Sequence, residues 1–323
     1  MKAIVVESFG GPEVLEIKEV PKPSFNENEV LIETRKTSVN FADIKKRRGK
    51  KGGGDSSFIP GLDAVGVVVG VGTNVTDIKE GDRVVAFPSS GSYAEFVVAS
   101  KDLTYVLPDK IDWNTAAASP IVSFLSYVLL NDLANLQEGE NVLIHSAAGG
   151  VGTTAVQLAK LLGADKVIGT VSSENKMSTV LEAGADHCLL YEDFSNQVNK
   201  LTNDIGVDII LDSVSGTVSE ESLECLAEYG RLVHFGNSSG EVGQFKTKDL
   251  HSSCRSILGF SLGNTRKKRP KSLKRVANEV FKLLEEEKLS IMVGEEFNLE
   301  EANKAHEFIE SRKSTGKILL HVK

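Results

Sequence analysis

The sequence predicts an α/β protein with two domains, one a barrel-like β domain and the other a doubly wound parallel sheet. Three observations predict this fold. Short strands separated by turn residues fill positions 1–110, strands and helices alternate from Asn114 onwards, and residues 317–322 form a last apolar strand. Because a terminal strand needs a sheet to join, we expect the chain to return to the β domain. The predicted domains are residues 1–120 completed by residues 265–323, and residues 121–264.

The β domain is predicted from short apolar runs that are separated by glycine and proline. After a first strand near the N-terminus, the runs lie at residues 15–20, 30–34, 64–71, 84–87 and 93–98. Turn signals stand between them, among them Gly10-Gly11-Pro12 and Lys79-Glu80-Gly81-Asp82. Short strands at such regular spacing are typical of an antiparallel, barrel-like sheet.

The second domain is predicted from apolar runs that alternate with helical patterns. The expected strands lie at residues 142–144, 166–171, 188–191, 207–211 and 232–235. The expected helices lie at residues 115–130 with a break at Pro120, 151–162, 176–183 and 218–228. Two further helices are expected in the tail, near residues 273–284 and 299–311. Ligands of such parallel sheets bind at the carboxyl ends of the strands.

A loop of small residues follows the first of these strands and opens the next helix. Its spacing is Ala147-x-Gly149-x-x-Gly152, one residue away from the Gly-x-Gly-x-x-Gly pattern of dinucleotide-binding loops. Glycine allows a sharp turn and a close approach of a pyrophosphate, while the helix N-terminus offers N–H groups and a positive dipole end. The loop residues predicted to bind a dinucleotide are Ala148, Gly149, Gly150, Val151 and Gly152.

The tip of the second strand distinguishes between two dinucleotides. An NAD site usually carries an acidic residue there, about 20 residues after the glycines, for the ribose 2′-hydroxyl. Here the tip is Ser172-Ser173, with Lys176 three residues further on, and Glu174 is expected to belong to the first turn of the next helix. Two hydroxyls and an ammonium group suit a 2′-phosphate, which a carboxylate would repel. The sequence therefore predicts NADPH as the cofactor, bound by Ser172, Ser173 and Lys176.

Composition excludes several classes of partner. The formal net charge is −8, so we expect neither nucleic-acid nor anionic-membrane binding. The longest apolar run, residues 121–130, is too short to span a bilayer and is interrupted by Ser123 and Ser126. The three cysteines, Cys188, Cys225 and Cys254, lie far apart without metal-type spacing, which is typical of a reducing cytoplasm. Cys188 and Cys225 are expected to be buried and inert.

Two basic runs depart from this acidic background. Residues 45–51 hold six cations in seven positions and are followed by three glycines, and residues 266–271 hold five cations in six positions. Such runs usually form solvated loops. The alternative is that the first run attracts NADPH or an anionic substrate such as an acyl-CoA to the cofactor site.

Motifs spread over essentially the whole chain occur together in a fixed order. They are Thr37-Ser38-Val39-Asn40-Phe41-Ala42-Asp43, Pro60-Gly61-Leu62-Asp63-Ala64-Val65-Gly66, Gly81-Asp82-Arg83-Val84, the glycine loop, Asp212-Ser213-Val214, Phe235-Gly236-Asn237-Ser238-Ser239-Gly240, Ala305-His306-Glu307 and Gly316-Lys317. As a set, they resemble the zinc-independent quinone oxidoreductases of the medium-chain dehydrogenase/reductase superfamily, the group that includes ζ-crystallin. This resemblance implies a GroES-like β-barrel catalytic domain, a Rossmann-type cofactor domain and a homodimer.

The resemblance also bears on zinc. In the zinc-bearing branch a cysteine matches Asn40, and a Gly-His-Glu triplet matches Gly61-Leu62-Asp63. This chain has neither that cysteine nor that histidine, and its six histidines lack ligand spacing. We therefore expect no metal.

Site roles follow from the resemblance, position by position. It implies that Asn40 lies near the nicotinamide ribose and carboxamide with Asp43 close behind it, and that Tyr191 joins Ser173 and Lys176 around the 2′-phosphate. It also implies that Phe235, Gly236 and Asn237 help to cover the cofactor. Where close relatives often place a tyrosine facing the cofactor, this chain has Lys45, so its acceptor range can differ from theirs.

The expected activity is NADPH-dependent hydride transfer to a quinone or an α,β-unsaturated carbonyl, with Asn40, Asp43 and Lys45 as the candidate catalytic residues. Asn40 and Lys45 are candidate donors to the acceptor oxygen. The alternatives are that Asn40 is a turn residue whose side chain bonds only the backbone, and that Asp43 is a helix cap. His145 is expected to be a core residue. Two alternatives stay open, an enoyl-thioester (acyl-CoA) reductase and a non-catalytic, NADPH-binding sensor protein.

Overall fold

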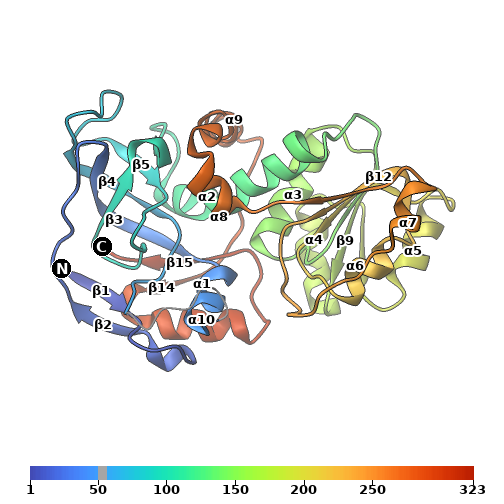
Figure 1. Ribbon diagram of the computed structural model, residues 1–323, viewed down its shortest axis with the longest axis horizontal. Coiled ribbons are helices and arrows are strands. Elements are labelled where there is room, and N and C mark those ends of the chain that lie inside the picture. The colour runs from blue at the N-terminus through green and yellow to red at the C-terminus, as the bar shows by residue number, and fades with distance from the viewer. Residues whose placement is uncertain (50–56) are drawn as a thin grey trace. The chain divides into compact units, whose positions relative to one another are not determined.

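The computed structural model describes residues 1–49 and 57–323 of the chain. The chain divides into two compact units (Figure 1). The first unit combines Met1–Ile121 with Asn264–Lys323, and the second is Val122–Gly263.

The first unit is built on a largely antiparallel sheet. Its strands are β3 (Glu29–Val39), β4 (Ala64–Val71), β5 (Arg83–Ala86), β6 (Phe96–Ser100), β7 (Thr104–Val106), β14 (Val293–Asn298) and β15 (Lys317–His321). The order is β14-β15-β3-β4-β5-β7, and β6 also pairs with β3. Strands β1 (Lys2–Val5) and β2 (Glu16–Glu19) form a separate pair. Strand β15 pairs antiparallel with β3, so the predicted return of the chain to the β domain is confirmed.

Helices α1 (Phe41–Arg47), α9 (Leu273–Glu285) and α10 (Ala302–Glu310) belong to the same unit. Alternating apolar residues of the strands supply its core, for example Val30 and Ile32 of β3 and Val84 of β5, all fully buried. Helix α1 begins directly where β3 ends, and this junction places the polar residues considered below.

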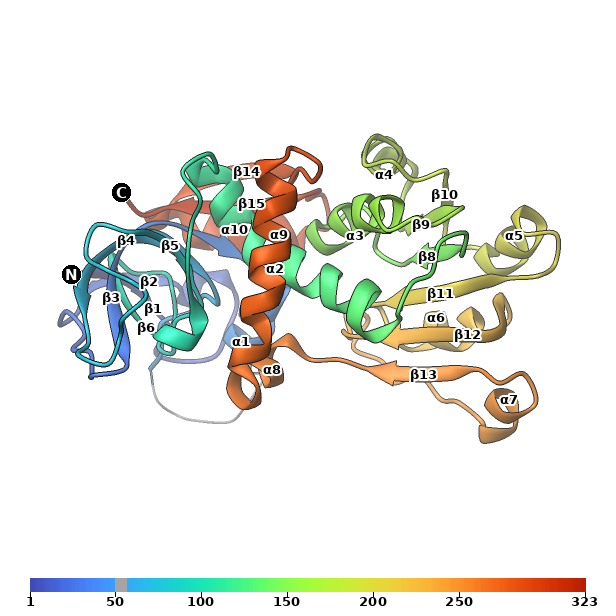
Figure 2. The ribbon, with the colours of Figure 1, turned by 90° about the horizontal axis from the view of Figure 1, so that it is seen from above.

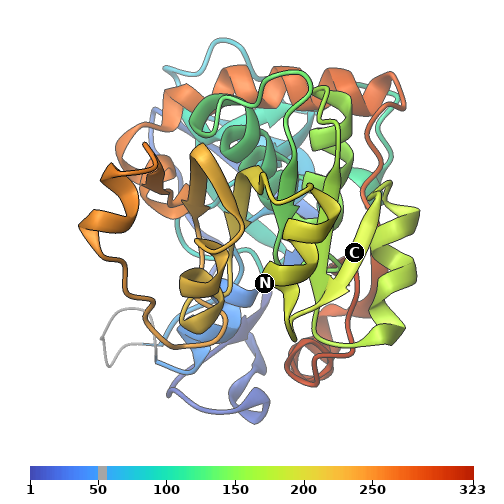
Figure 3. The ribbon, with the colours of Figure 1, turned by 90° about the vertical axis from the view of Figure 1, so that its right-hand side faces the viewer.

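The second unit contains a parallel sheet of order β10-β9-β8-β11-β12-β13 (Figures 2 and 3). Its strands are β8 (Val142–Ile144), β9 (Val167–Val171), β10 (His187–Leu190), β11 (Val207–Asp212), β12 (Leu226–His234) and β13 (Ser256–Gly259). Its helices include α3 (Gly150–Leu161), α4 (Met177–Glu182), α5 (Phe194–Leu201), α6 (Thr217–Ser222) and α7 (Thr247–His251). The direction in which successive strands are added reverses between β8 and β11, because β9 and β10 lie on one side of β8 and β11 to β13 lie on the other. Ligands of a doubly wound sheet bind at that switch point, and the glycine loop follows β8.

Helix α2 (Trp113–Tyr127) corrects one prediction, because it continues through Pro120. Proline lacks the N–H that would bond the carbonyl four residues earlier, which is that of Ala116. The hydroxyl of Ser119 donates to this carbonyl over 3.4 Å, so the carbonyl keeps a partner and the helix is not interrupted.

The predicted helix at residues 218–228 is also too long. Helix α6 ends at Ser222 and β12 begins at Leu226, which pairs with Val207 of β11. The apolar Leu226 and Ala227 are buried in this sheet rather than on a helix face.

One segment of the described chain, Trp113–Leu133, is a helix long and apolar enough to cross a membrane by composition alone. Inside the structure, 72% of its most apolar window is buried. Burial of this kind is also found in the core helix of a globular fold, so the segment is weak support for a membrane span.

Candidate functional site

The glycine loop of the second unit joins β8 to α3 at the switch point of the sheet. Gly149 is the N-cap of α3, and Gly152 lies in its first turn. A Cβ atom on Gly152 would lie 2.5 Å from the Cα and the carbonyl oxygen of Ala147, so only glycine permits this approach of helix and strand. At Gly149 the nearest atom to a Cβ would be 3.4 Å away. The helix N-terminus therefore lies close above the strand, and its first N–H groups lack partners within the helix.

Tyr191, which follows β10, reaches back to this loop. The backbone N–H of Ser146 donates to the Tyr191 hydroxyl over 2.8 Å, and the Ser146 hydroxyl lies 3.3 Å from the same oxygen. The Tyr191 ring also stacks on His145 with ring centres 5.8 Å apart. Since the tyrosine oxygen accepts the backbone proton, its own proton can be donated to Ser146 or to a ligand oxygen.

The predicted phosphate residues lie together in one turn after β9. Ser173 is the N-cap of a short 3₁₀ helix, Glu174–Lys176, and its hydroxyl donates to the side chain of Asn175 over 2.6 Å. Ser172 and Glu174 are exposed, whereas Ser173 and Lys176 are half-buried. The turn presents hydroxyl and ammonium groups at the carboxyl end of β9, which is where a parallel sheet binds its ligand.

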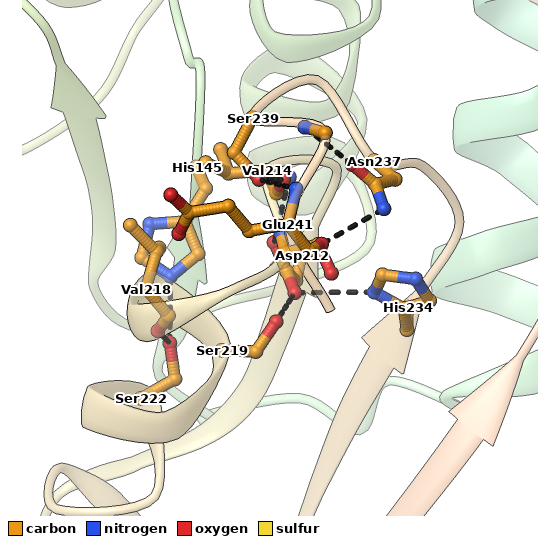
Figure 4. Close-up of polar contacts among 12 residues, drawn as sticks. His145, Asp212, Val214, Val218, Ser219, Ser222, His234, Asn237, Ser239 and Glu241 are labelled. Atoms are coloured by element: carbon orange, nitrogen blue, oxygen red, sulfur yellow. Dashed lines mark hydrogen bonds and ion pairs between the residues drawn. The ribbon is translucent and has the colours of Figure 1, made fainter. Parts of the chain in front are cut away.

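The loop after β12 uses its asparagine for its own fold (Figure 4). The Asn237 side chain donates to the carbonyl of Glu241 over 2.8 Å, and its oxygen accepts from the N–H of Gly240 over 2.6 Å. The backbone N–H of Phe235 donates to the carbonyl of Asp212 over 2.9 Å, which ties the start of the loop to β11. Contact of Phe235, Gly236 and Asn237 with a cofactor stays a prediction.

His145, on the same sheet, is a core residue as expected. It is 1% exposed, and its two ring nitrogens lie 2.7 Å from the Thr170 hydroxyl and 2.9 Å from the Ser222 hydroxyl. Burial lowers the pKa of His145 to about 4, so the ring is neutral near pH 7.

In the first unit, the junction of β3 and α1 gathers a buried polar cluster. Asn40 is the N-cap of α1 and Asp43 its third residue, and one carboxylate oxygen of Asp43 accepts from the Asn40 backbone N–H over 2.9 Å. The other oxygen accepts from the N–H of Gly61 over 3.2 Å. Asp43 therefore caps the helix and fixes the loop at Gly61. Burial raises the pKa of Asp43 to about 7. Its catalytic role stays a prediction.

Asp63 lies beside Asn40 and was not among the predicted site residues. Its carboxylate accepts from the Ser38 hydroxyl over 2.7 Å and from the Ser38 backbone N–H over 3.1 Å. The Asn40 side-chain nitrogen lies 3.2 Å from the Ser38 hydroxyl and 3.4 Å from the Asp63 carboxylate. Asn40 thus donates towards Ser38, and Ser38 donates to Asp63, which accepts at the end of the series and is 1% exposed.

Lys317, the first residue of β15, completes this cluster. Its ammonium nitrogen lies 2.8 Å from the side-chain oxygen of Asn40 and 3.2 Å from the carbonyl of Val39, and the residue is 4% exposed. Burial lowers the pKa of Lys317, while the charges of Asp63 and Asp43 act in the opposite direction. Two signals in the sequence could have indicated Lys317: a charged residue at the start of a largely apolar strand, and its place in the Gly316-Lys317 motif.

The prediction that the basic runs form solvated loops is wrong for two arginines. Arg47 ends helix α1 and is fully buried, where it pairs with Glu310 and donates to the carbonyl of Gly10. Arg266, on helix α8 (Leu262–Lys268), is half-buried and donates to the carbonyl of Leu62 over 2.9 Å. Lys50 and Lys51 of the first run, and the glycines after them, lie outside the described residues.

Lys45 lies on the last turn of α1 and is half-buried. Its ammonium nitrogen lies 5.4 Å from the centre of the Phe41 ring. The side chain is therefore partly held by its own helix, and its proposed role as a donor stays a prediction.

The cysteines differ in exposure. Cys225 is buried, Cys188 is half-buried rather than buried, and Cys254 is exposed. Burial raises the pKa of Cys188 to about 11 and that of Cys225 to about 12, which keeps both as unreactive thiols. Over residues 1–49 and 57–323, no group of three or more His, Cys, Asp or Glu side chains is placed to hold a metal ion.

Comparisons with known proteins cover the whole chain. A family model described as zinc-binding dehydrogenase matches residues 150–278, and one described as alcohol dehydrogenase GroES-like domain matches residues 26–109. The chain is 36% identical to the quinone oxidoreductase of Pseudomonas aeruginosa over 99% of each chain, and 36% identical to quinone oxidoreductase 1 of Escherichia coli over 98% of each. The structure of the Escherichia coli quinone oxidoreductase complexed with NADPH matches it with a TM-score of 0.93 at 34% identity, over 100% of both chains.

Proposed function

Because the chain belongs to the quinone oxidoreductase family of the medium-chain dehydrogenase/reductase superfamily, we propose that it is an NADPH-dependent reductase of quinones or α,β-unsaturated carbonyls that works without zinc. The observation that carries the proposal is the glycine loop at the switch point of the parallel sheet, in a chain that matches these relatives over its full length. NADPH supplies the hydride, so the chain has to bind the cofactor, orient the acceptor and exclude water.

The residues of the second unit fit a phosphorylated dinucleotide. The close approach of Gly152 to Ala147 leaves the N-terminus of α3 open to a pyrophosphate, and Tyr191 lies over the same loop. Ser173 and Lys176 offer a hydroxyl and an ammonium group to a 2′-phosphate. The expected preference is therefore for NADPH over NADH.

Asn40 is the proposed donor at the reacting end of the cofactor. Its carboxamide oxygen is held by Lys317, and its nitrogen faces the carbonyl and hydroxyl of Ser38 and the carboxylate of Asp63, so the NH₂ is the group proposed to donate to the cofactor carboxamide or to the acceptor oxygen. That oxygen gains negative charge as hydride arrives, and a fixed N–H directed at it lowers the barrier. Lys45 is a second proposed donor on the same helix.

Zinc independence is supported by the residues that stand at the positions of the zinc ligands in the zinc-bearing branch. Asn40 offers a carboxamide oxygen in place of a thiolate, and this oxygen already accepts from the ammonium group of Lys317. Leu62 offers no ligand atom. Carboxamide oxygens are poor zinc ligands compared with thiolates and imidazoles.

The acceptor is tested by NADPH oxidation with 1,4-benzoquinone, 9,10-phenanthrenequinone and crotonyl-CoA, before and after treatment with a chelator. The proposal expects turnover with the quinones that the chelator does not reduce. Turnover confined to crotonyl-CoA would support the enoyl-thioester reductase instead. Binding of NADPH without turnover of any acceptor would support the sensor. The cytoplasmic location and the homodimer remain predictions of the sequence, and the latter is measured by analytical ultracentrifugation.

A further inference from the structure

Strand register places Lys317 next to Asn40. Ile318 of β15 lies opposite Val39 of β3 in an antiparallel pair, so the next step along both strands brings position 317 beside position 40. The N–H of Lys317 donates to the carbonyl of Met292 over 2.8 Å, which fixes the backbone at the start of the strand. The position of the lysine side chain is therefore set by β3 and by the segment at Met292, and not by solvent.

The contacts of Asn40 allow a single orientation of its carboxamide. Lysine can only donate, so the group 2.8 Å from the Lys317 nitrogen has to be the amide oxygen. A carboxylate can only accept, and the Ser38 hydroxyl donates its proton to Asp63 over 2.7 Å. The group that faces Ser38 and Asp63 is therefore the amide NH₂. A rotation by half a turn would direct the amide oxygen at a carboxylate and the NH₂ at the lysine.

The burial of the cluster makes this arrangement strict. Asn40 is 8% exposed and Lys317 is 4% exposed, so neither group can replace a lost partner with bulk water at low cost. Two carboxylates, Asp43 and Asp63, act on Lys317 from the α1 and β4 sides of the cluster. With Lys317 absent, the Asn40 oxygen would lose its donor, and both carboxylates would lose a neighbouring cation.

We propose that Lys317 is a positioning residue that fixes the carboxamide of Asn40 with its oxygen towards the lysine, so that the amide offers its NH₂ and not its oxygen to the cofactor and the acceptor. This inference rests on the proposed function, because it acts through the donor role of Asn40. It assigns to Lys317 a role that a lysine elsewhere in the sheet does not have.

The test is a double-mutant cycle with Lys317→Met and Asn40→Ala, in which methionine keeps the bulk of the side chain and removes the donor. Lys36→Met is the matched control, since Lys36 is a partly buried lysine on β3 that bonds Asn114 and Glu296 instead. The measured quantities are kcat and KM with NADPH and benzoquinone, the Kd for NADPH, and thermal unfolding of each variant. Where Lys317→Met does not fold, Lys317→Leu takes its place, because leucine likewise has no hydrogen-bond donor.

The proposal expects Lys317→Met to lower kcat/KM about tenfold or more, mainly through kcat, and Lys36→Met to change it less than about twofold. In the Asn40→Ala background, Lys317→Met should cost less than about threefold further. An equal loss in both backgrounds would overturn the inference, because Lys317 would then act independently of Asn40. If the wild type turns over no acceptor, the proposed function fails. The inference is then decided by the same double-mutant cycle, measured by the Kd for NADPH instead of by kcat/KM.

Discussion

The hydroxyl of Tyr191 accepts a hydrogen bond of 2.8 Å from the backbone N–H of Ser146, and so joins the end of β10 to the glycine loop after β8. The loop that the sequence predicts to hold the pyrophosphate is thereby connected to a residue that the family resemblance places at the 2′-phosphate. Cofactor affinity should therefore depend on this contact.

We expect Tyr191→Phe to raise the Kd for NADPH about three- to tenfold, because it removes a hydroxyl from the loop and leaves the ring against His145. Tyr105→Phe is the control, since that hydroxyl donates to the carbonyl of Asp102 over 3.4 Å in the first unit and is no part of the glycine loop. Isothermal titration calorimetry measures both. An unchanged Kd for Tyr191→Phe would show that the Tyr191 hydroxyl does not contribute to NADPH binding.

We expect Gly152→Ala to destabilise the second unit by about 1–3 kcal/mol, since the added Cβ would lie 2.5 Å from backbone atoms of Ala147. Gly259→Ala is the matched control, because a Cβ there meets nothing within 4 Å. Denaturant unfolding measures the difference. Equal stability of the two variants would show that the helix can move away from the strand without cost.

A histidine in the first unit makes stability depend on pH. His306 is fully buried, with its ring nitrogens 3.1 Å from the Tyr93 hydroxyl and 3.3 Å from the Arg47 guanidinium. Burial, with a contribution from the Arg47 charge, lowers the pKa of His306 to about 3 from an ordinary value of 6.5. The folded state therefore keeps the ring neutral while the unfolded state takes up a proton below pH 6.5. Its stabilising contribution is complete above that pH and is lost as the pH falls towards 3.

We expect the wild type to lose about 2 kcal/mol through His306 between pH 7 and pH 5, and His306→Gln to lose correspondingly less over that interval. The exposed His251 provides the control in His251→Gln. Urea unfolding at several pH values measures the slopes. The same slope in wild type and His306→Gln would contradict a buried, neutral His306.

Much of the architecture was predictable from local patterns. Strand β4 occupies the predicted residues 64–71, and the GroES-like and Rossmann-type domains implied by the resemblance are confirmed. The regular spacing of apolar residues and turns carries this information because each strand buries one face in its own sheet. Strand β14 was missed because four of its six residues are Gly, Glu, Glu and Asn, and so it lacks an apolar pattern.

The candidate site was less predictable because its partners are distant in sequence. Asn40 meets Asp63 across 23 residues and Lys317 across 277 residues, and no local pattern encodes either contact. Arg47 resembled its solvated neighbours in the basic run, although it is buried against Glu310. Pro120 suggested a helix break, because the compensating bond from Ser119 is visible only in three dimensions.

The most direct test of the account is steady-state oxidation of NADPH and of NADH with benzoquinone, in wild type, Lys176→Ala and Lys166→Ala. Lys166 is the matched control, a half-buried lysine directly before β9 that pairs with Asp165. The account predicts quinone turnover that prefers NADPH, a loss of about tenfold or more of that preference in Lys176→Ala, and none in Lys166→Ala. Turnover that is equal with both cofactors, or NADPH binding without quinone turnover, would contradict it.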